Sequence, residues 1–339
     1  MTENQIYERL TMLAYMPMYH EVMKTALELD VFSRLSKPKS ALAMAEGNGW
    51  DAKNTEVFLN ALHAMGFLQK DRDFFSNTEE SERYLTFSGP DSMAGFLLLF
   101  MKDNAAVPDM KKLIQAGTDP ADEEEPLEAL DLTPIAAELR AAQMGRRQQE
   151  VLEIVRNLPE NGSIRRVLDI GSSTGMIGLS VIRDMPGRTG VLFDIRPFVP
   201  LMEESIRLEG LSGRAQALSG DFMTADLGRE WDLILAVAIM GFVGKRRKQF
   251  MRRIYDALRP GGVLLCIAEG VVKPDYSGPW DAMLGFLPFL FRGKDILTMD
   301  GETEKAAEEA GFLVESRPAL LCSGNQQVLI LRKPKNITD

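Results

Sequence analysis

Residues 167–178 read VLDIGSSTGMIG, an apolar run of strand length that passes directly into a turn of small residues and then into a helix-like segment. Gly171 and Gly175 leave room for the backbone to approach a ligand, and the amides at the start of the next helix can face its polar groups. The spacing differs from the dinucleotide pattern, because Ser173 stands where GxGxxG requires glycine. The segment predicts an α/β fold with a ligand site at a strand end, and a purely structural tight turn is the alternative.

Further strand-like runs downstream also end in acidic residues. Residues 190–194 (GVLFD) place Asp194 about 25 positions after Asp169, and an acid there can hold ribose hydroxyls. Residues 220–222 (GDF) add another acid with an aromatic neighbour, and residues 231–239 form a long apolar strand. Because ligands of open α/β sheets bind at the carboxyl edge, we expect these strand ends to form one site.

A helix and another strand continue the alternation. Residues 245–258 place basic and apolar residues at helical spacing, and Arg-Pro-Gly-Gly at 259–262 ends that helix before the apolar strand 263–268. The order is that of a doubly wound α/β sheet.

Several segments in this order resemble the class I S-adenosylmethionine-dependent methyltransferases, and within them the small-molecule O-methyltransferase-like branch with an N-terminal winged-helix dimerisation domain. The segments are VLDIGSSTG (167–175), LFDIRPF (192–198), GDF (220–222), LRPGGVLLCIAEG (258–270) and GETEKAAEEAGF (301–312). The resemblance implies a Rossmann-like sheet with helices on both faces, S-adenosyl-L-methionine as cofactor and S-adenosyl-L-homocysteine as product. It implies a cofactor site made of Asp169, Gly171, Ser172, Ser173, Gly175, Asp194, Ile195, Gly220, Asp221, Phe222 and Val237.

Specific roles follow from the same resemblance. Gly171 and Gly175 would line the methionine moiety, Asp194 would bind the ribose, and Asp221 with Phe222 would contact the adenine. Each position also has an ordinary structural alternative. Asp169 and Asp194 could cap neighbouring backbone. Asp221 and Phe222 could be a loop acid and a core aromatic that contact no ligand.

The catalytic position departs from the resembling family. That family usually has a histidine base about twenty residues before the Pro-Gly-Gly turn, and this chain has Met240 there. Without a histidine, S- or C-methylation becomes more plausible, as does O-methylation with a carboxylate base. Glu269, at the end of the strand after Pro-Gly-Gly, is the candidate base, and a role in holding local backbone is its alternative.

An acceptor pocket is expected at the same edge of the sheet. Methionine and aromatic side chains suit an apolar or planar acceptor, although core packing explains such residues equally well. The predicted acceptor residues are Met144, Met240, Phe242, Trp280 and Met283.

The N-terminal part predicts a second domain. Residues 21–36 and 56–70 have helical spacing, and a turn-rich piece at 71–76 completes a winged-helix-like pattern. A ligand-sensing DNA-binding regulator is therefore a rival hypothesis, but a formal net charge of -10 and the lack of an arginine cluster argue against it. In the resembling family this domain serves dimerisation, so we expect a homodimer and no nucleic-acid partner.

The expected organisation is a dimerisation domain at 1–115, an acidic linker and connecting helix at 116–158, and a catalytic domain at 159–339. An amphipathic pattern covers 132–158. Cys266 and Cys322 lack CxxC spacing, which favours reduced core thiols and no metal site. The apolar run 281–291 is too short to span a membrane, and the N-terminal residues lack a signal-like pattern, so a cytoplasmic location is expected.

The sequence therefore predicts a methyltransferase that uses S-adenosylmethionine on a small-molecule acceptor. Two alternatives stay open. One is a relative that binds the cofactor without catalysis, and the other, which the sequence favours least, is the DNA-binding regulator.

Overall fold

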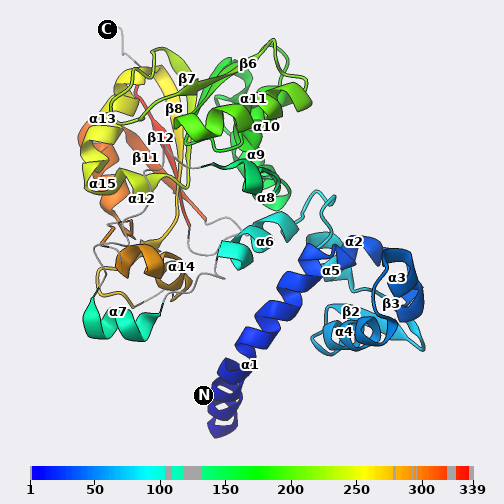
Figure 1. The fold of residues 1–339 in the computed structure, drawn as a ribbon. Helices are drawn as coiled ribbons and strands as arrows, with labels where there is room; N and C mark the ends of the chain where they lie inside the picture. Colours follow the sequence, from blue (N-terminus) through cyan, green and yellow to red (C-terminus); the bar gives the residue numbers. More distant parts are fainter. Residues whose placement is uncertain are drawn as a thin grey trace. The chain divides into compact units, whose positions relative to one another are not determined.

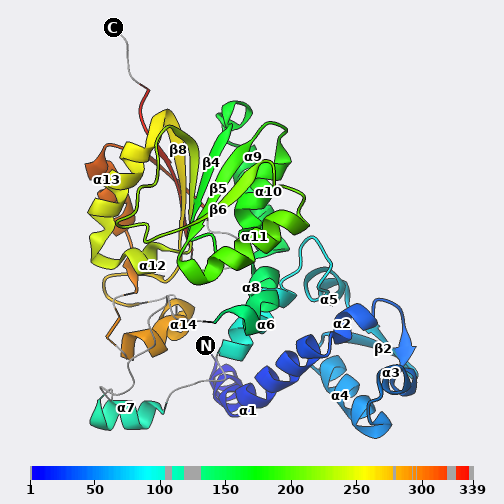
Figure 2. The same cartoon turned by 45° about the horizontal axis from the view of Figure 1, so that its top comes forward.

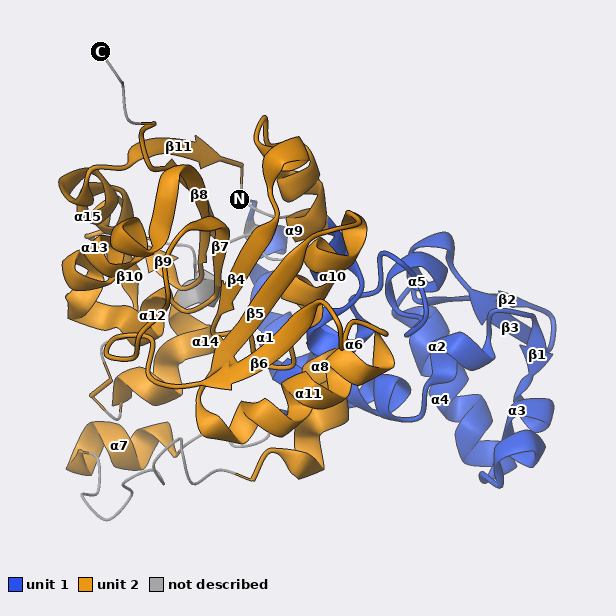
Figure 3. Ribbon diagram, turned by 90° about the horizontal axis from the view of Figure 1, so that it is seen from above, with its two compact units in different colours: residues 1–106, 141–149 blue, residues 107–140, 150–339 orange. Residues whose placement is uncertain are grey.

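The structure is a computed structural model that describes residues 2–103, 109–117, 131–277, 280–291, 293–294, 296–318 and 326–335. Contacts within the chain divide it into two compact units, which Figure 3 shows in different colours. Unit 1 comprises residues 1–106 and 141–149, and unit 2 comprises residues 107–140 and 150–339. The functional domains expected at 1–115, 116–158 and 159–339 stay a prediction, because a division by contacts does not test the function of each part.

Unit 2 is built on a seven-stranded sheet in the order β11-β12-β8-β7-β4-β5-β6 (Figure 1). The strands from β4 to β8 pair in parallel, and β12 runs antiparallel to both of its neighbours. The chain order reverses at β4, which lies between β5 and β7, and such a switch point is where open α/β sheets bind ligands. The bounds are β4 Arg166–Ile170, β5 Thr189–Asp194, β6 Ala215–Ser219, β7 Trp231–Val237, β8 Leu258–Ala268, β11 Leu313–Arg317 and β12 Gln327–Arg332.

Helices cover both faces of this sheet, as Figure 2 shows. On one face α9 (Arg146–Arg156), α10 (Met176–Asp184) and α11 (Val199–Leu208) contribute to one buried apolar cluster. On the other face α12 (Met240–Val243), α13 (Arg247–Ala257) and α15 (Glu302–Ala310) contribute to a second cluster. All seven residues of β7 are buried, as expected for a central strand covered on both sides. The predicted Rossmann-like sheet is confirmed.

Shorter elements complete unit 2. They are α7 (Met110–Ala116), η3 (Thr133–Ile135), most of α8 (Ala136–Gln143), η4 (Asn161–Ser163), η5 (Arg196–Phe198), η6 (Gly244–Arg246), β9 (Val271–Val272), α14 (Trp280–Phe291) and β10 (Thr298–Met299). Strands β9 and β10 pair in parallel, and α14 lies between them in the chain.

The amphipathic stretch 132–158 is divided between α8 and α9. The break falls at Met144 and Gly145, where Gly145 has a φ of +67°. A Cβ at Gly145 would lie 2.1 Å from the carbonyl oxygen of Ser92, so this position requires glycine. Close packing of Gly145 on Ser92 within unit 1 therefore accompanies the end of α8. The helical periodicity of the sequence does not reveal this contact.

Unit 1 is mainly helical and has a small antiparallel sheet in the order β1-β3-β2. The turn-rich piece predicted at 71–76 belongs to the hairpin of β2 and β3. The helix expected at 21–36 begins much earlier and breaks at Asp30, which has a φ of 49°. The bounds are α1 Glu3–Glu28, α2 Val31–Arg34, β1 Lys39–Ser40, α3 Ala41–Asn48, α4 Ala52–Ala64, β2 Leu68–Asp71, β3 Phe74–Asn77, α5 Glu79–Tyr84 and α6 Ala94–Asp103.

A fully buried arginine lies at one end of the seven-stranded sheet. Arg188 precedes β5 and donates to the carbonyl oxygens of Ile164 at 3.3 Å, Val181 at 3.1 Å and Asn161 at 2.8 Å. Asp184 lies 3.7 Å away and supplies the nearest opposite charge. The guanidinium therefore joins η4, α10 and β5 through buried carbonyls that need donors.

Replacing Arg188 by methionine should lower the free energy of unfolding by about 3 kcal/mol, because the buried carbonyls lose their donors. The measurement is urea denaturation followed by tryptophan fluorescence. Arg207→Met is the control, since the Arg207 side chain is 65% exposed and pairs with Glu204 on the same helix. Equal losses in the two variants would contradict the assignment.

Candidate functional site

The carboxyl ends of β4 to β8 meet at one edge of the sheet, and backbone hydrogen bonds connect them. The amide of Gly171 donates to the carbonyl oxygen of Phe193 at 2.8 Å, which joins the ends of β4 and β5. The amide of Gly220 donates to the carbonyl oxygen of Asp194 at 3.0 Å, which joins β5 and β6. The structure thus brings the predicted cofactor residues to a single edge: Asp169 to Gly175 follow or end β4, Asp194 and Ile195 end β5, Gly220 to Phe222 follow β6, and Val237 ends β7.

The two glycines of the first turn are needed for the packing of the chain itself. Gly171 has a φ of +67° and Gly175 a φ of +83°, a region that disfavours residues with a Cβ. A Cβ at Gly171 would lie 2.2 Å from Cγ2 of Ile239, and one at Gly175 would lie 2.4 Å from Cδ1 of Leu192. The side chains of Ile239, after β7, and Leu192, in β5, lie where a Cβ would be, and the approach of a ligand to this backbone stays a prediction.

Asp169 lies beneath this turn. Its side chain is 2% exposed and accepts hydrogen bonds from the hydroxyl of Ser172 at 2.6 Å and the amide of Gly178 at 3.2 Å. Burial raises the pKa of the carboxyl to about 7, against the opposing effect of these hydrogen bonds. The contacts support the capping role considered for Asp169, and its contact with the cofactor stays a prediction.

Asp194 is held at the end of β5 by two backbone amides. The amide of Ser173 donates to Oδ2 at 2.7 Å, and the amide of Ile195 donates to Oδ1 at 2.7 Å. Burial raises the pKa of this carboxyl to about 6, although both hydrogen bonds lower it. Each carboxylate oxygen can accept more than one hydrogen bond, so the fixed side chain retains capacity for the hydroxyls of a ribose.

The third acid and its aromatic neighbour are anchored more locally. Asp221 is exposed and accepts from the amide of Met223 at 2.8 Å and the hydroxyl of Thr224 at 3.2 Å. Phe222 is half-buried, and its ring meets that of Phe250 edge-on with centroids 5.7 Å apart. Both contacts agree with the structural alternatives, and the adenine contact remains a prediction.

The predicted acceptor residues differ widely in exposure. Met240 is fully buried in the apolar cluster, so its side chain packs in the core and does not line an open surface. Phe242 on α12 is 54% exposed, and Met283 on α14 is half-buried against Val272 and Leu297. The side chain of Trp280 lies outside the described residues. Met144 is 40% exposed but belongs to unit 1, so its place in an acceptor pocket stays a prediction.

The candidate base Glu269 has a partner that the sequence did not reveal. Glu269 is half-buried directly after β8, and Nε2 of Gln326 donates to its Oε1 at 2.7 Å. Gln326 directly precedes the antiparallel strand β12, whose first residue, Gln327, pairs with Ala268 of β8. An antiparallel last strand begins where the parallel strands end, and that rule is the signal that could have found Gln326.

Helix α14 closes over the next residue. Gly270 has a φ of +65°, and a Cβ there would lie 2.5 Å from Cε2 of Phe286. The Phe286 ring therefore packs directly on the backbone beside the candidate base. This contact places an apolar side chain of α14 next to the backbone that follows Glu269.

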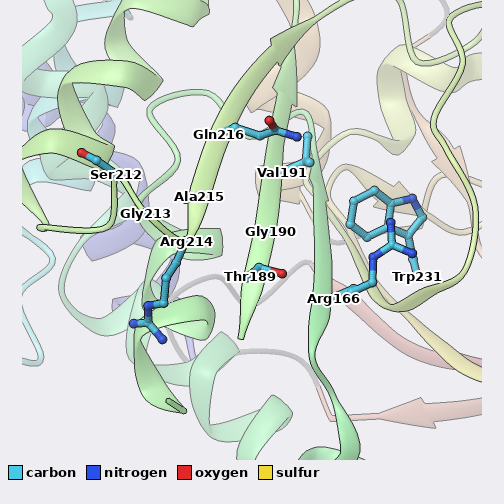
Figure 4. Close-up of a pocket in the computed structure, with 10 residues that line it drawn as sticks. All are labelled: Arg166, Thr189, Gly190, Val191, Ser212, Gly213, Arg214, Ala215, Gln216 and Trp231. Atoms are coloured by element: carbon cyan, nitrogen blue, oxygen red, sulfur yellow. The ribbon is translucent and has the colours of Figure 1, made fainter. Parts of the chain in front are cut away.

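A cavity of about 330 Å³ lies at the opposite, amino edge of the sheet. Figure 4 shows Arg166 beside Trp231, with the guanidinium carbon 4.6 Å from the ring centroid, while the Arg214 side chain points away from them. The lining residues lie at or near the amino ends of β4 to β7, so the cavity is separate from the site predicted at the carboxyl edge. Within the described ranges no group of three His, Cys, Asp or Glu could hold a metal ion, and no helix is long and apolar enough to cross a membrane.

Comparison with known proteins decides the family. The model of the O-methyltransferase domain matches residues 142–313, and the model of the O-methyltransferase dimerisation domain matches residues 12–87. The chain belongs to the O-methyltransferase family. The resemblance drawn from the sequence motifs is thereby confirmed.

Individual relatives are distant but cover most of the chain. A 3-hydroxy-5-methyl-1-naphthoate 3-O-methyltransferase of Streptomyces sahachiroi is 24% identical over 78% of this chain and 77% of its own length. The N,N-dimethyltransferase OxyT of Streptomyces rimosus is also 24% identical, over 87% of this chain and 88% of its own. The crystal structure of human N-acetylserotonin methyltransferase in complex with S-adenosylmethionine shares the fold, with a TM-score of 0.74, 22% identity and coverage of 98% and 99%.

The raised pKa of Asp194 predicts how this O-methyltransferase family member binds S-adenosylhomocysteine at different pH. Ribose hydroxyls donate hydrogen bonds, so the ionised carboxylate should bind the ligand more tightly than the neutral acid. Affinity should be constant above pH 7 and fall as the pH drops through about 6, approaching tenfold per pH unit where the neutral acid predominates. Calorimetric titration between pH 5 and 8 measures it.

Asp194→Asn should bind more weakly and lose most of this pH dependence. Asp226→Asn is the control, because Asp226 accepts from the amide of Gly228 in a loop away from the turn. An unchanged pH profile in Asp194→Asn would show that another group controls binding.

Proposed function

We propose that this protein transfers the methyl group of S-adenosylmethionine to an oxygen atom of a small hydroxylated aromatic molecule. The observation that carries the proposal is the carboxylate of Glu269, which lies half-buried at the edge of the sheet that also holds the glycine turn and Asp194. Family membership and the 3-O-methyltransferase activity named for the Streptomyces sahachiroi relative support oxygen as the acceptor atom.

The residues of the carboxyl edge suit the cofactor by their chemistry. The donor supplies an electrophilic methyl group on a positively charged sulfur. Asp194, fixed by the amides of Ser173 and Ile195, would accept from the ribose hydroxyls, and the turn at Gly171 to Gly175 would lie beside the methionine part. Asp169 would act through the turn, since its contacts are with Ser172 and Gly178.

Glu269 would act as the proton acceptor in place of the histidine that this chain lacks. A hydroxyl is a poor nucleophile until it loses its proton, and a carboxylate within hydrogen-bonding reach can take that proton as the new bond forms. Most of the remaining barrier is overcome by alignment with the methyl group and exclusion of water, because the donor is already reactive.

A relative that binds the cofactor without catalysis is the second candidate. The observation that favours it is Met240 at the predicted histidine position, because its thioether cannot act as a base and its side chain is packed in the core. Transfer of labelled methyl groups separates the two functions, because both would bind the cofactor. An N-acceptor is a further possibility, since OxyT is named for N,N-dimethylation.

Glu269→Gln should reduce kcat about a hundredfold, because the amide occupies the same space but cannot take the proton. Affinity for S-adenosylhomocysteine should not change. The measurement is steady-state transfer of labelled methyl groups to phenols. Glu308→Gln, an exposed change on α15, is the control, and wild-type turnover in Glu269→Gln would refute the assignment.

We also propose that the protein is a homodimer assembled through α1. Several large apolar side chains of this helix are exposed in the single chain, a pattern typical of a covered interface. The region overlaps the matched dimerisation domain at 12–87. The exposed residues are Ile6, Tyr7, Leu10, Met12, Leu13, Tyr15, Met16 and Met18.

The cytoplasmic location stays a prediction.

The double variant Leu10→Glu with Leu13→Glu should shift the protein from dimer to monomer, because two charges would be buried unpaired in the interface. Light scattering after size-exclusion chromatography measures the mass in solution. Glu8→Gln is the control on the same helix. A dimer that survives the double variant would place the interface elsewhere.

A further inference from the structure

The Gln326 side chain is buried at the edge of the sheet that holds the predicted site. It is 6% exposed, although it directly precedes the first residue of β12. Its amide nitrogen donates to the Glu269 carboxylate at 2.7 Å. A hydrogen bond from an amide to a carboxylate holds the acid's side chain in place.

The other end of the same amide has no partner among the described residues. The Oε1 atom of Gln326 is buried and accepts no hydrogen bond from them. Both amide atoms are bonded to one carbon, so this oxygen lies close to the carboxylate that the nitrogen contacts. Buried acceptors are normally satisfied. Oε1 of Gln327 is open as well, but it belongs to the amide bonded to Glu304, whereas the open oxygen of Gln326 lies beside the candidate base and so indicates a place for a donor on a ligand.

We infer that Gln326 is the positioning residue for Glu269 and that its amide oxygen selects acceptors with two hydrogen-bond donors on adjacent atoms. The substrate class is an aromatic ring with vicinal hydroxyls, or with a hydroxyl beside an amino group. One donor faces the Glu269 carboxylate, and its neighbour faces Oε1 of Gln326. The inference rests on the proposed function, because it assigns the acceptor of that same site.

The chemical step is a substitution at the methyl carbon. The hydroxyl oxygen next to Glu269 forms the new O–C bond while the C–S bond breaks and its electron pair stays on sulfur. The hydroxyl proton passes to the Glu269 carboxylate. The second hydroxyl keeps its proton and donates it to the Gln326 amide oxygen, which orients the ring.

The adjacent glutamine provides a matched control. Gln327 is the first residue of the same strand, and its Nε2 donates to Glu304 at 2.6 Å. Gln326→Leu and Gln327→Leu therefore make the same chemical change at neighbouring positions. Thermal unfolding of both variants shows whether the fold is retained.

The experiment compares kcat/KM for catechol, resorcinol and phenol, which differ in the number and adjacency of their hydroxyls. Wild-type protein should favour catechol over resorcinol by about tenfold or more, since resorcinol leaves the buried oxygen unpaired. Gln326→Leu should bring that ratio close to one and lower kcat, with unchanged affinity for S-adenosylhomocysteine. Gln327→Leu should keep the ratio.

A second variant separates positioning from simple loss of packing. Gln326→Glu places another carboxylate beside Glu269, so the acid limb of the kcat/KM profile should move upward by about one pH unit. An unmoved limb would overturn the positioning role. A wild-type ratio near one, or a ratio unchanged in Gln326→Leu, would overturn the substrate class.

Failure of the proposed function has a different signature. If Glu269→Gln transfers methyl groups at the wild-type rate, the base assignment fails and the inference fails with it. If Glu269→Gln is impaired while Gln326→Leu behaves like Gln327→Leu, the inference fails alone. Transfer to none of the three rings, with S-adenosylhomocysteine still bound, overturns the inference and contradicts the proposed acceptor class.

Discussion

The carbonyl oxygen of Phe193, at the end of β5, is the contact on which the catalytic edge depends. It accepts from the amides of Gly171 at 2.8 Å and Ser172 at 3.2 Å, so the turn after β4 is tied to its neighbouring strand. This forces Gly171 into positive φ, and the turn then delivers the Ser173 amide to Asp194. The position of Asp194, the predicted cofactor-binding acid, is therefore a consequence of parallel strand pairing.

Burial of two acids near this turn gives the edge its electrostatic character. Desolvation raises the pKa of Asp169 to about 7 and that of Asp194 to about 6. Their roles differ because Asp169 is bonded to a hydroxyl and an amide of the same loop, whereas Asp194 lies at a strand end that faces the site. Unpaired buried acids cost stability when ionised, a cost that proteins commonly accept at functional sites.

Periodicity and spacing in the sequence predicted much of the fold and of the cofactor edge. The strands at 190–194 and 231–239 and the Pro-Gly-Gly strand fall close to β5, β7 and β8, because buried parallel strands have a strong apolar pattern. The break at Gly145 was not predictable, since it depends on the carbonyl of Ser92 more than fifty residues away. The burial of Met240 was equally hidden, because a methionine after a strand looks alike in a core and in a pocket.

The contact between Gln326 and Glu269 is the clearest example of a feature that local sequence patterns do not predict. Its partner Glu269 is 57 residues earlier, and only the antiparallel pairing of β12 with β8 brings the two together. No local pattern distinguishes Gln326 from Gln327, yet the strand sends their side chains to different partners. Contacts made by sheet pairing over such distances require the tertiary structure.

The central claim is that this member of the O-methyltransferase family is catalytic although Met240 stands where the sequence motifs lead us to expect the family's histidine. The most direct test is transfer of labelled methyl from S-adenosylmethionine to phenolic acceptors by the purified wild-type protein, with S-adenosylhomocysteine binding measured on the same sample. The account predicts labelled O-methyl product that forms repeatedly per protein molecule. Tight binding of S-adenosylhomocysteine with no labelled product from oxygen, nitrogen or sulfur acceptors would contradict it and favour the non-catalytic relative.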